Sequence, residues 1–203
     1  MSYTVEIIRR HEQNTSTWSG GTTTQIAIYP PHAAYGERNF KWRLSSATVD
    51  QEESLFTSLP GIERIIMVLT GEMKLEHTGH HTACLQPFDQ DRFRGDWTSR
   101  SFGKVRDFNL MLAAGCAGQL QAFAVPSQAE RIMQVTPAVT TTAFYCVDNQ
   151  LHLTIGKQDS YDILAGDLLL VTGESGCQKP AVTLSNSTDK ATQVVIADIT
   201  YAK

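Results

Sequence analysis

The stretch from Phe40 to Gly71 constrains the fold of this chain more than any other part. It reads FKWRLSSATVDQEESLFTSLPGIERIIMVLTG. Two runs of apolar and β-branched residues flank a polar loop, and the second run ends at a glycine turn, so the pattern predicts two β-strands. Arg43 and Arg64 lie inside these runs, where a charge is costly unless it is partnered. The two arginines are therefore candidates for a functional site.

The rest of the 203-residue chain predicts an all-β protein. Short runs of Val, Ile, Thr and aromatic residues are separated by Gly, Pro, Asn and Asp, and helical periodicity is weak almost everywhere. Only Ser54–Phe56 and Gln128–Ile132 have a mildly helical pattern.

The second half of the chain repeats the layout of the first. Ala143–Ile155 resembles Ile65–Glu76, with an apolar strand, a polar turn and a second strand. We therefore expect two β-barrels in tandem, over residues 1–115 and 116–203, with an N-terminal strand that is free to cross over. The small residues of Ala113–Leu120 would join them. The alternative is a single large jelly-roll sandwich.

Charge and cysteine usage exclude several classes of protein. A net charge of −4 and a pI near 5.8 argue against nucleic acid as a partner. The chain shows no secretory h-region and no apolar run long enough to span a bilayer, so we expect a cytoplasmic protein without a membrane partner. The four cysteines form no C-x-x-C pair, and we expect them to be reduced and free of zinc: Cys84, Cys116, Cys146 and Cys177.

The strand–turn–strand pattern that ends in VLTGEM is typical of a cupin barrel, but the positions of the cupin metal ligands are occupied by other residues. Counting back from Gly71 puts Arg64 where a metal-binding cupin has its glutamate, and Arg92 takes the place of the last histidine. An arginine is a fixed cation and cannot ligate a metal. We expect no metal and no cofactor in the barrel, and an anion or carboxylate as its guest.

A second group of candidate ligands is H-x2-H-H at His77, His80 and His81. Thr78-Gly79 predicts a hairpin tip there, and no carboxylate or cysteine is spaced with the histidines. A solvated polar turn is the favoured interpretation.

Several short motifs resemble the HutD/Ves family of bicupin proteins. They occur in the family's order, most clearly from Trp18 to Met111: Trp18-Ser19-Gly20-Gly21, Trp42-Arg43, Pro60-Gly61 through Arg64, Pro87-Phe88, and Asp107-Phe108-Asn109 with Met111. The resemblance implies two cupin barrels in one cytoplasmic chain that binds or senses a metabolite, with a link to histidine utilisation. The sequence departs from the family at Thr24-Gln25, where an arginine and a carboxylate are usual.

Strand alternation groups the candidate binding residues. Arg43 shares a face with Ser45, and Asp107 shares one with Asn109 and Met111. We expect Arg43 or Arg64 to bind a ligand carboxylate, with Asp107 and Asn109 orienting it. The alternative is an internal Arg–Asp salt bridge. Two further residues complete the expected site: Trp18, in a mobile loop over the barrel mouth, and Thr24.

These features favour a protein that binds a small carboxylate metabolite rather than an enzyme. One alternative is a metal-free isomerase or epimerase of cupin type, for which His152 is the candidate base. Another is a structural or interaction module without a ligand. Exposed edge strands also suggest a homodimer.

Overall fold

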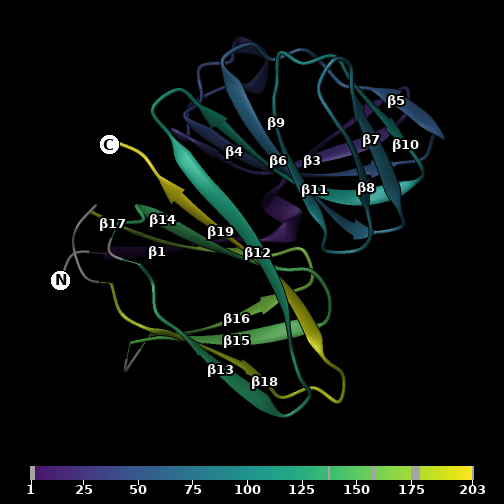
Figure 1. Ribbon diagram of the computed structural model, residues 1–203. Coiled ribbons are helices and arrows are strands. Elements are labelled where there is room, and N and C mark those ends of the chain that lie inside the picture. Colours follow the sequence, from purple (N-terminus) through teal and green to yellow (C-terminus); the bar gives the residue numbers. More distant parts are fainter. Residues whose placement is uncertain (1–2, 137, 157–158, 175–178, 203) are drawn as a thin grey trace. The chain divides into compact units, whose positions relative to one another are not determined.

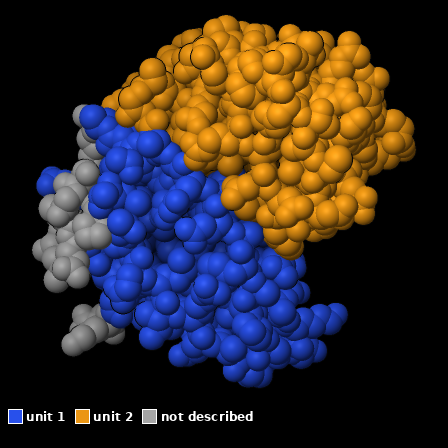
Figure 2. Space-filling view, in the orientation of Figure 1, with its two compact units in different colours: residues 1–12, 117–203 blue, residues 13–116 orange. Residues whose placement is uncertain are grey.

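The computed structural model describes residues 3–136, 138–156, 159–174 and 179–202 of the chain (Figure 1). Within these ranges all regular elements are β-strands, apart from two 3-10 turns at Arg10–Glu12 and Tyr35–Glu37. The chain divides into two compact units, coloured separately in Figure 2: residues 13–116, and residues 1–12 together with 117–203. The chain therefore divides beside the expected boundary at 115, and the N-terminal strand belongs to the second unit.

Residues 13–116 form two antiparallel sheets. The larger sheet has six strands in the order β2 (Asn14–Trp18), β3 (Gly21–Tyr29), β4 (Trp42–Val49), β11 (Val105–Ala113), β6 (Ile62–Thr70) and β9 (Gln90–Arg94). The smaller sheet has four strands in the order β5 (Glu53–Leu55), β10 (Ser99–Phe102), β7 (Met73–His77) and β8 (Thr82–Leu85).

The other unit is also built from two antiparallel sheets. Its five-stranded sheet has the order β1 (Tyr3–Ile8), β17 (Leu168–Gly173), β14 (Thr141–Cys146), β19 (Thr192–Thr200) and β12 (Ala117–Val125). Its four-stranded sheet has the order β13 (Ala129–Met133), β18 (Val182–Asn186), β15 (Gln150–Ile155) and β16 (Asp159–Leu164).

The two units repeat one strand order, which confirms the prediction of two tandem cupin barrels. The order β9-β6-β11-β4 in one unit corresponds to β17-β14-β19-β12 in the other, and β5-β10-β7-β8 corresponds to β13-β18-β15-β16. The single large sandwich is therefore wrong. The hairpin of β2 and β3 extends only the first repeat, and β1 extends only the second.

Both segments with a mildly helical pattern are strands. Most of Ser54–Phe56 lies in β5, which pairs with β10, and most of Gln128–Ile132 lies in β13, which pairs with β18. Pairing with a neighbouring strand outweighs such weak local preferences.

The interiors of the two units differ in polarity. The unit with β1 is filled by a large apolar cluster that includes Phe144, Leu153 and Ile196. In residues 13–116 the apolar cluster around Ile66 and Leu75 shares the interior with buried polar side chains. Among these polar side chains are two arginines, Arg43 and Arg64, together with Asp107 and Asn109.

Two sequence expectations concern the whole chain. No helix in the described ranges has the length and apolar character needed to cross a membrane. Cys84, Cys116 and Cys146 are free thiols, and Cys177 lies outside the described residues.

Candidate functional site

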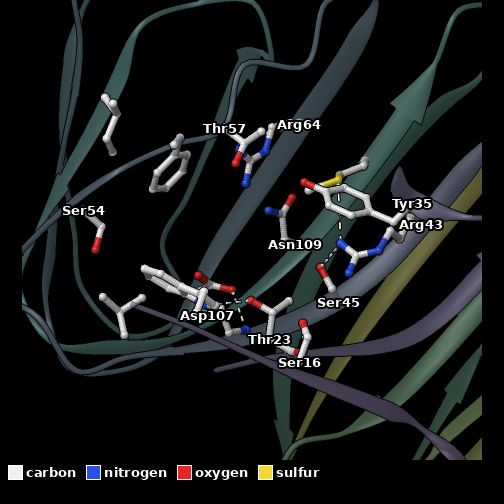
Figure 3. Close-up of a pocket in the computed structure, with 16 residues that line it drawn as sticks. Ser16, Thr23, Tyr35, Arg43, Ser45, Ser54, Thr57, Arg64, Asp107 and Asn109 are labelled. Atoms are coloured by element: carbon white, nitrogen blue, oxygen red, sulfur yellow. Dashed lines mark hydrogen bonds between the residues drawn. The ribbon is translucent and has the colours of Figure 1, made fainter. Parts of the chain in front are cut away.

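Three adjacent strands bring the candidate residues onto one face. In the register of β4, β11 and β6, Arg43 lies opposite Met111, and Met111 lies opposite Arg64. The same strands place Asn109 opposite Ser45 two residues along. Because side chains two residues apart on a strand point to the same face, both arginines share a wall with Asn109 (Figure 3).

This wall borders a cavity of about 300 Å³. That volume is at the small end of the range for ligand pockets. The lining residues come from the six-stranded sheet, from β5 and from the loops beside them: Ser16, Trp18, Thr23, Tyr35, Arg43, Ser45, Ala47, Val49, Ser54, Leu55, Phe56, Thr57, Arg64, Asp107, Asn109 and Met111. Five of the six predicted ligand-binding residues are among them; the exception is Thr24.

Arg64 is buried in the cavity wall without an acidic partner. Its guanidinium lies over the rings of Phe56 and Phe93, at 4.6 and 5.1 Å from their centroids. Its Nε is buried and makes no hydrogen bond, and no carboxylate of the described residues forms an ion pair with it. Burial lowers the pKa of Arg64 to about 10, so the group is still charged at neutral pH. The guanidinium is an unneutralised cation beside the cavity.

Arg43 is held by neutral groups. Its Nε donates to Gln25 Oε1 and its Nη1 donates to Ser45 Oγ, each at 3.0 Å. The guanidinium also stacks over the Tyr35 ring at 4.3 Å, and burial lowers its pKa. Gln25 is the position at which the HutD/Ves pattern has a carboxylate, so the departure noted in the sequence leaves the charge of Arg43 unneutralised.

Asp107 is a buried acid with one fixed hydrogen bond. Its Oδ1 accepts from the Ala47 backbone N–H at 3.1 Å. Burial raises the pKa of Asp107 to about 6, opposed by this hydrogen bond and by the charge of Arg64. The expected alternative, an internal Arg–Asp salt bridge, is not formed, since no described arginine lies within ion-pairing distance of Asp107.

Two further polar atoms of the lining have no protein partner. Asn109 Oδ1 and Ser54 Oγ are buried and make no hydrogen bond within the described residues. A buried polar atom without a partner costs about 1–3 kcal/mol. Together with Arg64 Nε, these atoms make a ligand or bound water with both donors and acceptors a favourable occupant.

Trp18 lies at the cavity on the β2–β3 hairpin rather than in a mobile loop. Its Nε1 donates to Thr23 Oγ1 at 3.2 Å, and the residue is 37% exposed. The prediction that Thr24 belongs to the site is wrong, because Thr24 does not line the cavity. Strand alternation turns it away from Thr23, and its hydroxyl instead forms a 2.8 Å hydrogen bond with Thr15.

We expect Gly20→Ala to displace the Trp18 indole. A Cβ at Gly20 would lie 2.0 Å from the ring, so the ring has to move. The Trp18 contribution to fluorescence emission should shift, with a loss of stability below about 1 kcal/mol, since a side chain moves and not the backbone. Gly36→Ala is the matched control, because a Cβ there meets no atom within 4 Å. The expectation fails if emission is unchanged, or if the control shifts it equally.

Other sequence candidates lie outside the cavity. His152 Nδ1 and Asp162 Oδ1 are 2.8 Å apart on β15 and β16, at the surface of the other unit. Arg92 forms an ion pair with Glu63 between β9 and β6, and both side chains are exposed.

The sequence missed Tyr35, Thr23 and Phe56 as lining residues. Tyr35 lies on a 3-10 turn between β3 and β4, and it reaches Arg43 only through the folded chain. No pattern in the sequence places it there. Thr23 was detectable in principle, because alternation along β3 gives it the face opposite Thr24.

Residues 10–192 match the HutD family, and the chain therefore belongs to it. A curated relative, the uncharacterized 21.2 kDa protein in the hutC 3' region of Pseudomonas putida, is 33% identical over 115 residues. That match spans 54% of this chain and only 58% of the relative. The resemblance read from the short motifs is thus confirmed.

Solved structures agree with this assignment. The conserved protein of unknown function PA5104 from Pseudomonas aeruginosa PAO1 superposes with a TM-score of 0.83 at 26% identity, over 97% of this chain and 99% of that one. HutD from Pseudomonas fluorescens SBW25, in a formate condition, gives 0.76 at 21% identity, over 98% and 100%. Bacillus subtilis oxalate decarboxylase shares the fold alone, with a TM-score of 0.70 at 7% identity over 97% and 78%.

Proposed function

We propose that this protein binds a small carboxylate metabolite in the cavity of residues 13–116, and that it does so in histidine utilisation. The observation that carries the proposal is the pair of buried guanidinium groups, Arg43 and Arg64, neither of which has an acidic partner in the described residues. An arginine presents a planar fork of donors that matches a carboxylate. An anionic ligand would neutralise the charge that the fold leaves exposed to the cavity.

The balance of charge in the lining supports an anion. Two guanidinium cations face one carboxyl group, Asp107, whose pKa is raised to about 6 by burial. Asn109 Oδ1 has no partner, so a ligand that also carries an N–H or O–H donor would bind better than a bare anion. The position of the Pseudomonas putida relative in the hutC 3' region supports a link to histidine utilisation.

The test is thermal unfolding with matched pairs of acids and amides. Formate is compared with formamide, and glutamate with glutamine; urocanate and formylated glutamate extend the series. A ligand that binds only the folded state raises the unfolding midpoint, by about 2.7 kcal/mol of stabilisation at a hundred times its Kd. We expect at least one acid to raise the midpoint while its amide does not.

Arg64→Ala is expected to remove that shift. Arg94→Ala is the control, because Arg94 belongs to the same unit and pairs at the surface with Asp96. The proposal is wrong if no acid shifts the wild-type midpoint, or if Arg64→Ala keeps the full shift. All samples contain the same chelator concentration, so that a metal effect cannot mimic a ligand effect.

A further inference from the structure

A second group of chemically competent side chains lies outside the cavity. His77 ends β7, His81 follows the turn before β8, and Asp91 is on β9. Asp91 accepts from both histidines: His77 Nε2 lies 2.9 Å from Oδ2, and His81 Nε2 lies 3.0 and 3.1 Å from the two oxygens. Two imidazole nitrogens therefore converge on one carboxylate. The sequence expectation of a solvated turn is wrong for His77, which is buried.

The ring of His77 is fixed by a second hydrogen bond. Its Nδ1 lies 2.6 Å from Ser99 Oγ, and that hydroxyl can donate to the Trp97 carbonyl at 3.3 Å. Without a metal, Nε2 donates to Asp91 and Nδ1 accepts from the Ser99 hydroxyl. In the other tautomer Nδ1 donates to Ser99, the Ser99 hydroxyl donates to the Trp97 carbonyl, and the Nε2 lone pair is available to a metal. A histidine that binds a metal through one nitrogen typically donates the other N–H to such a partner.

The donor distances are close to those of a zinc site. With zinc–ligand bonds of about 2.0–2.1 Å, the donors of a tetrahedral site are about 3.3 Å apart. The three donor atoms here lie within 4.8 Å of one another, and both histidine–Asp91 separations are already near the tetrahedral value. The side chain of His81 is 40% exposed and that of Asp91 is 14% exposed, so a cation and a water ligand have access from solvent.

We propose that His77 Nε2, His81 Nε2 and the Asp91 carboxylate bind one divalent cation of the zinc type. Two imidazoles and a carboxylate are a donor set that zinc accepts, with water in the fourth position. Binding moves the His77 proton to Nδ1 and replaces the hydrogen bonds to Asp91 by metal–ligand bonds. None of the three donors lines the cavity. The ring of Phe93 lies near both sites, with its centroid 4.4 Å from that of His77 and 5.1 Å from the Arg64 guanidinium.

His80 serves as a built-in control. Its ring stacks on Trp97, with centroids 3.7 Å apart and planes inclined by 12°, and it is not one of the converging donors. It shares the turn, the residue type and the solvent exposure of the site. If any exposed histidine of this turn bound zinc nonspecifically, removing His80 and removing His81 would reduce zinc affinity equally.

The experiment is a calorimetric titration of the chelator-treated, dialysed 203-residue chain with zinc, repeated with cobalt(II) to read the ligand set from its absorption spectrum. We expect one zinc per chain. His81→Ala and Asp91→Asn should each weaken binding by tenfold or more, and His80→Ala should leave it unchanged. Ser99→Ala should weaken binding by about 10- to 100-fold, as for other second-sphere partners of a ligating histidine.

The proposal is overturned if zinc does not bind at one saturable site per chain, or if His80→Ala loses as much affinity as His81→Ala. Full affinity in Asp91→Asn also overturns it. The His81 side chain is 40% exposed, so we expect its removal to leave the fold intact, which the circular dichroism spectrum of each variant checks. Carboxylate binding in the cavity is measured in the same variants and is expected to be unaffected.

Discussion

Arg64→Met is expected to abolish carboxylate binding while leaving the ligand-free protein at least as stable as the wild type. Removing one partner of a buried charged pair costs about 2–5 kcal/mol of binding, or roughly 30- to 4,000-fold in Kd. The free energy of unfolding, by contrast, should not decrease in this variant. The wild-type guanidinium is buried without an ion pair or a hydrogen bond from Nε, so the fold carries the cost of its desolvation.

Methionine suits the space that Arg64 leaves. It is unbranched, has a similar length, and makes favourable contacts with aromatic rings such as Phe56 and Phe93, which now flank the guanidinium. Replacing buried charges by apolar side chains of similar volume is often neutral or stabilising by about 1–4 kcal/mol. We expect a gain of about 1 kcal/mol in the free energy of unfolding, because the stacking on the two rings offsets part of the desolvation cost.

Denaturant unfolding and ligand calorimetry on the same samples separate the two effects. Arg43→Met is the matched control, because Arg43 donates to Gln25 and Ser45 and its removal leaves those groups without a partner. It should lose both affinity and stability. If Arg64→Met instead loses about 2 kcal/mol or more of stability, Arg64 is a structural residue and the proposed ligand role fails.

Strand alternation, with its period of two residues, predicted which side chains share a face within β4, β6 and β11. That Arg43, Arg64 and Asn109 face one cavity was implied by the family resemblance, and it depends on how these strands pair in the folded chain. The repeat in the second half also followed from pattern alone. Both predictions depend on strongly apolar strands, in which a polar residue is conspicuous.

The features that the sequence did not predict depend on contacts between residues that are far apart in the chain. Tyr35 comes from a turn, and β5 forms because it pairs with β10 and not because Glu53–Leu55 prefers a strand. His77 looked solvated because its partners are distant in the chain: Asp91 is on β9 and Ser99 on β10. Short-range patterns contain no information about such contacts, so the histidine cluster was visible only in the folded chain.

Asp107→Asn is expected to stabilise the protein at pH 7 and to have little effect at pH 4. The pKa of Asp107 rises from an ordinary value of 3.8 to about 6 on folding, because burial disfavours the carboxylate. The folded state therefore binds more protons than the unfolded state between these two values. The contribution of Asp107 to the stability of the wild type should fall as the pH rises from about 4 to about 6 and then level off.

The size of the effect follows from the shift in pKa. At about 1.36 kcal/mol for each unit of pKa, the ionised Asp107 costs the fold about 3 kcal/mol at pH 7. Asparagine resembles the protonated acid, and its Oδ1 can still accept from the Ala47 N–H. The variant should regain up to that amount at pH 7. Comparing the two proteins at each pH cancels titrations that they share, such as that of His77.

Urea unfolding of both proteins between pH 4 and 8 measures this difference. Asp96→Asn is the control, since Asp96 pairs with Arg94 at the surface and should show little pH-dependent change. A difference that does not depend on pH, or a destabilised Asp107→Asn at pH 7, contradicts the expectation. A buried acid that lowers stability would be consistent with the proposed binding role, since functional sites are often suboptimal for stability. If Asp107 accepts a donor from the ligand, Asp107→Asn should therefore bind the carboxylate more weakly even though it folds more stably.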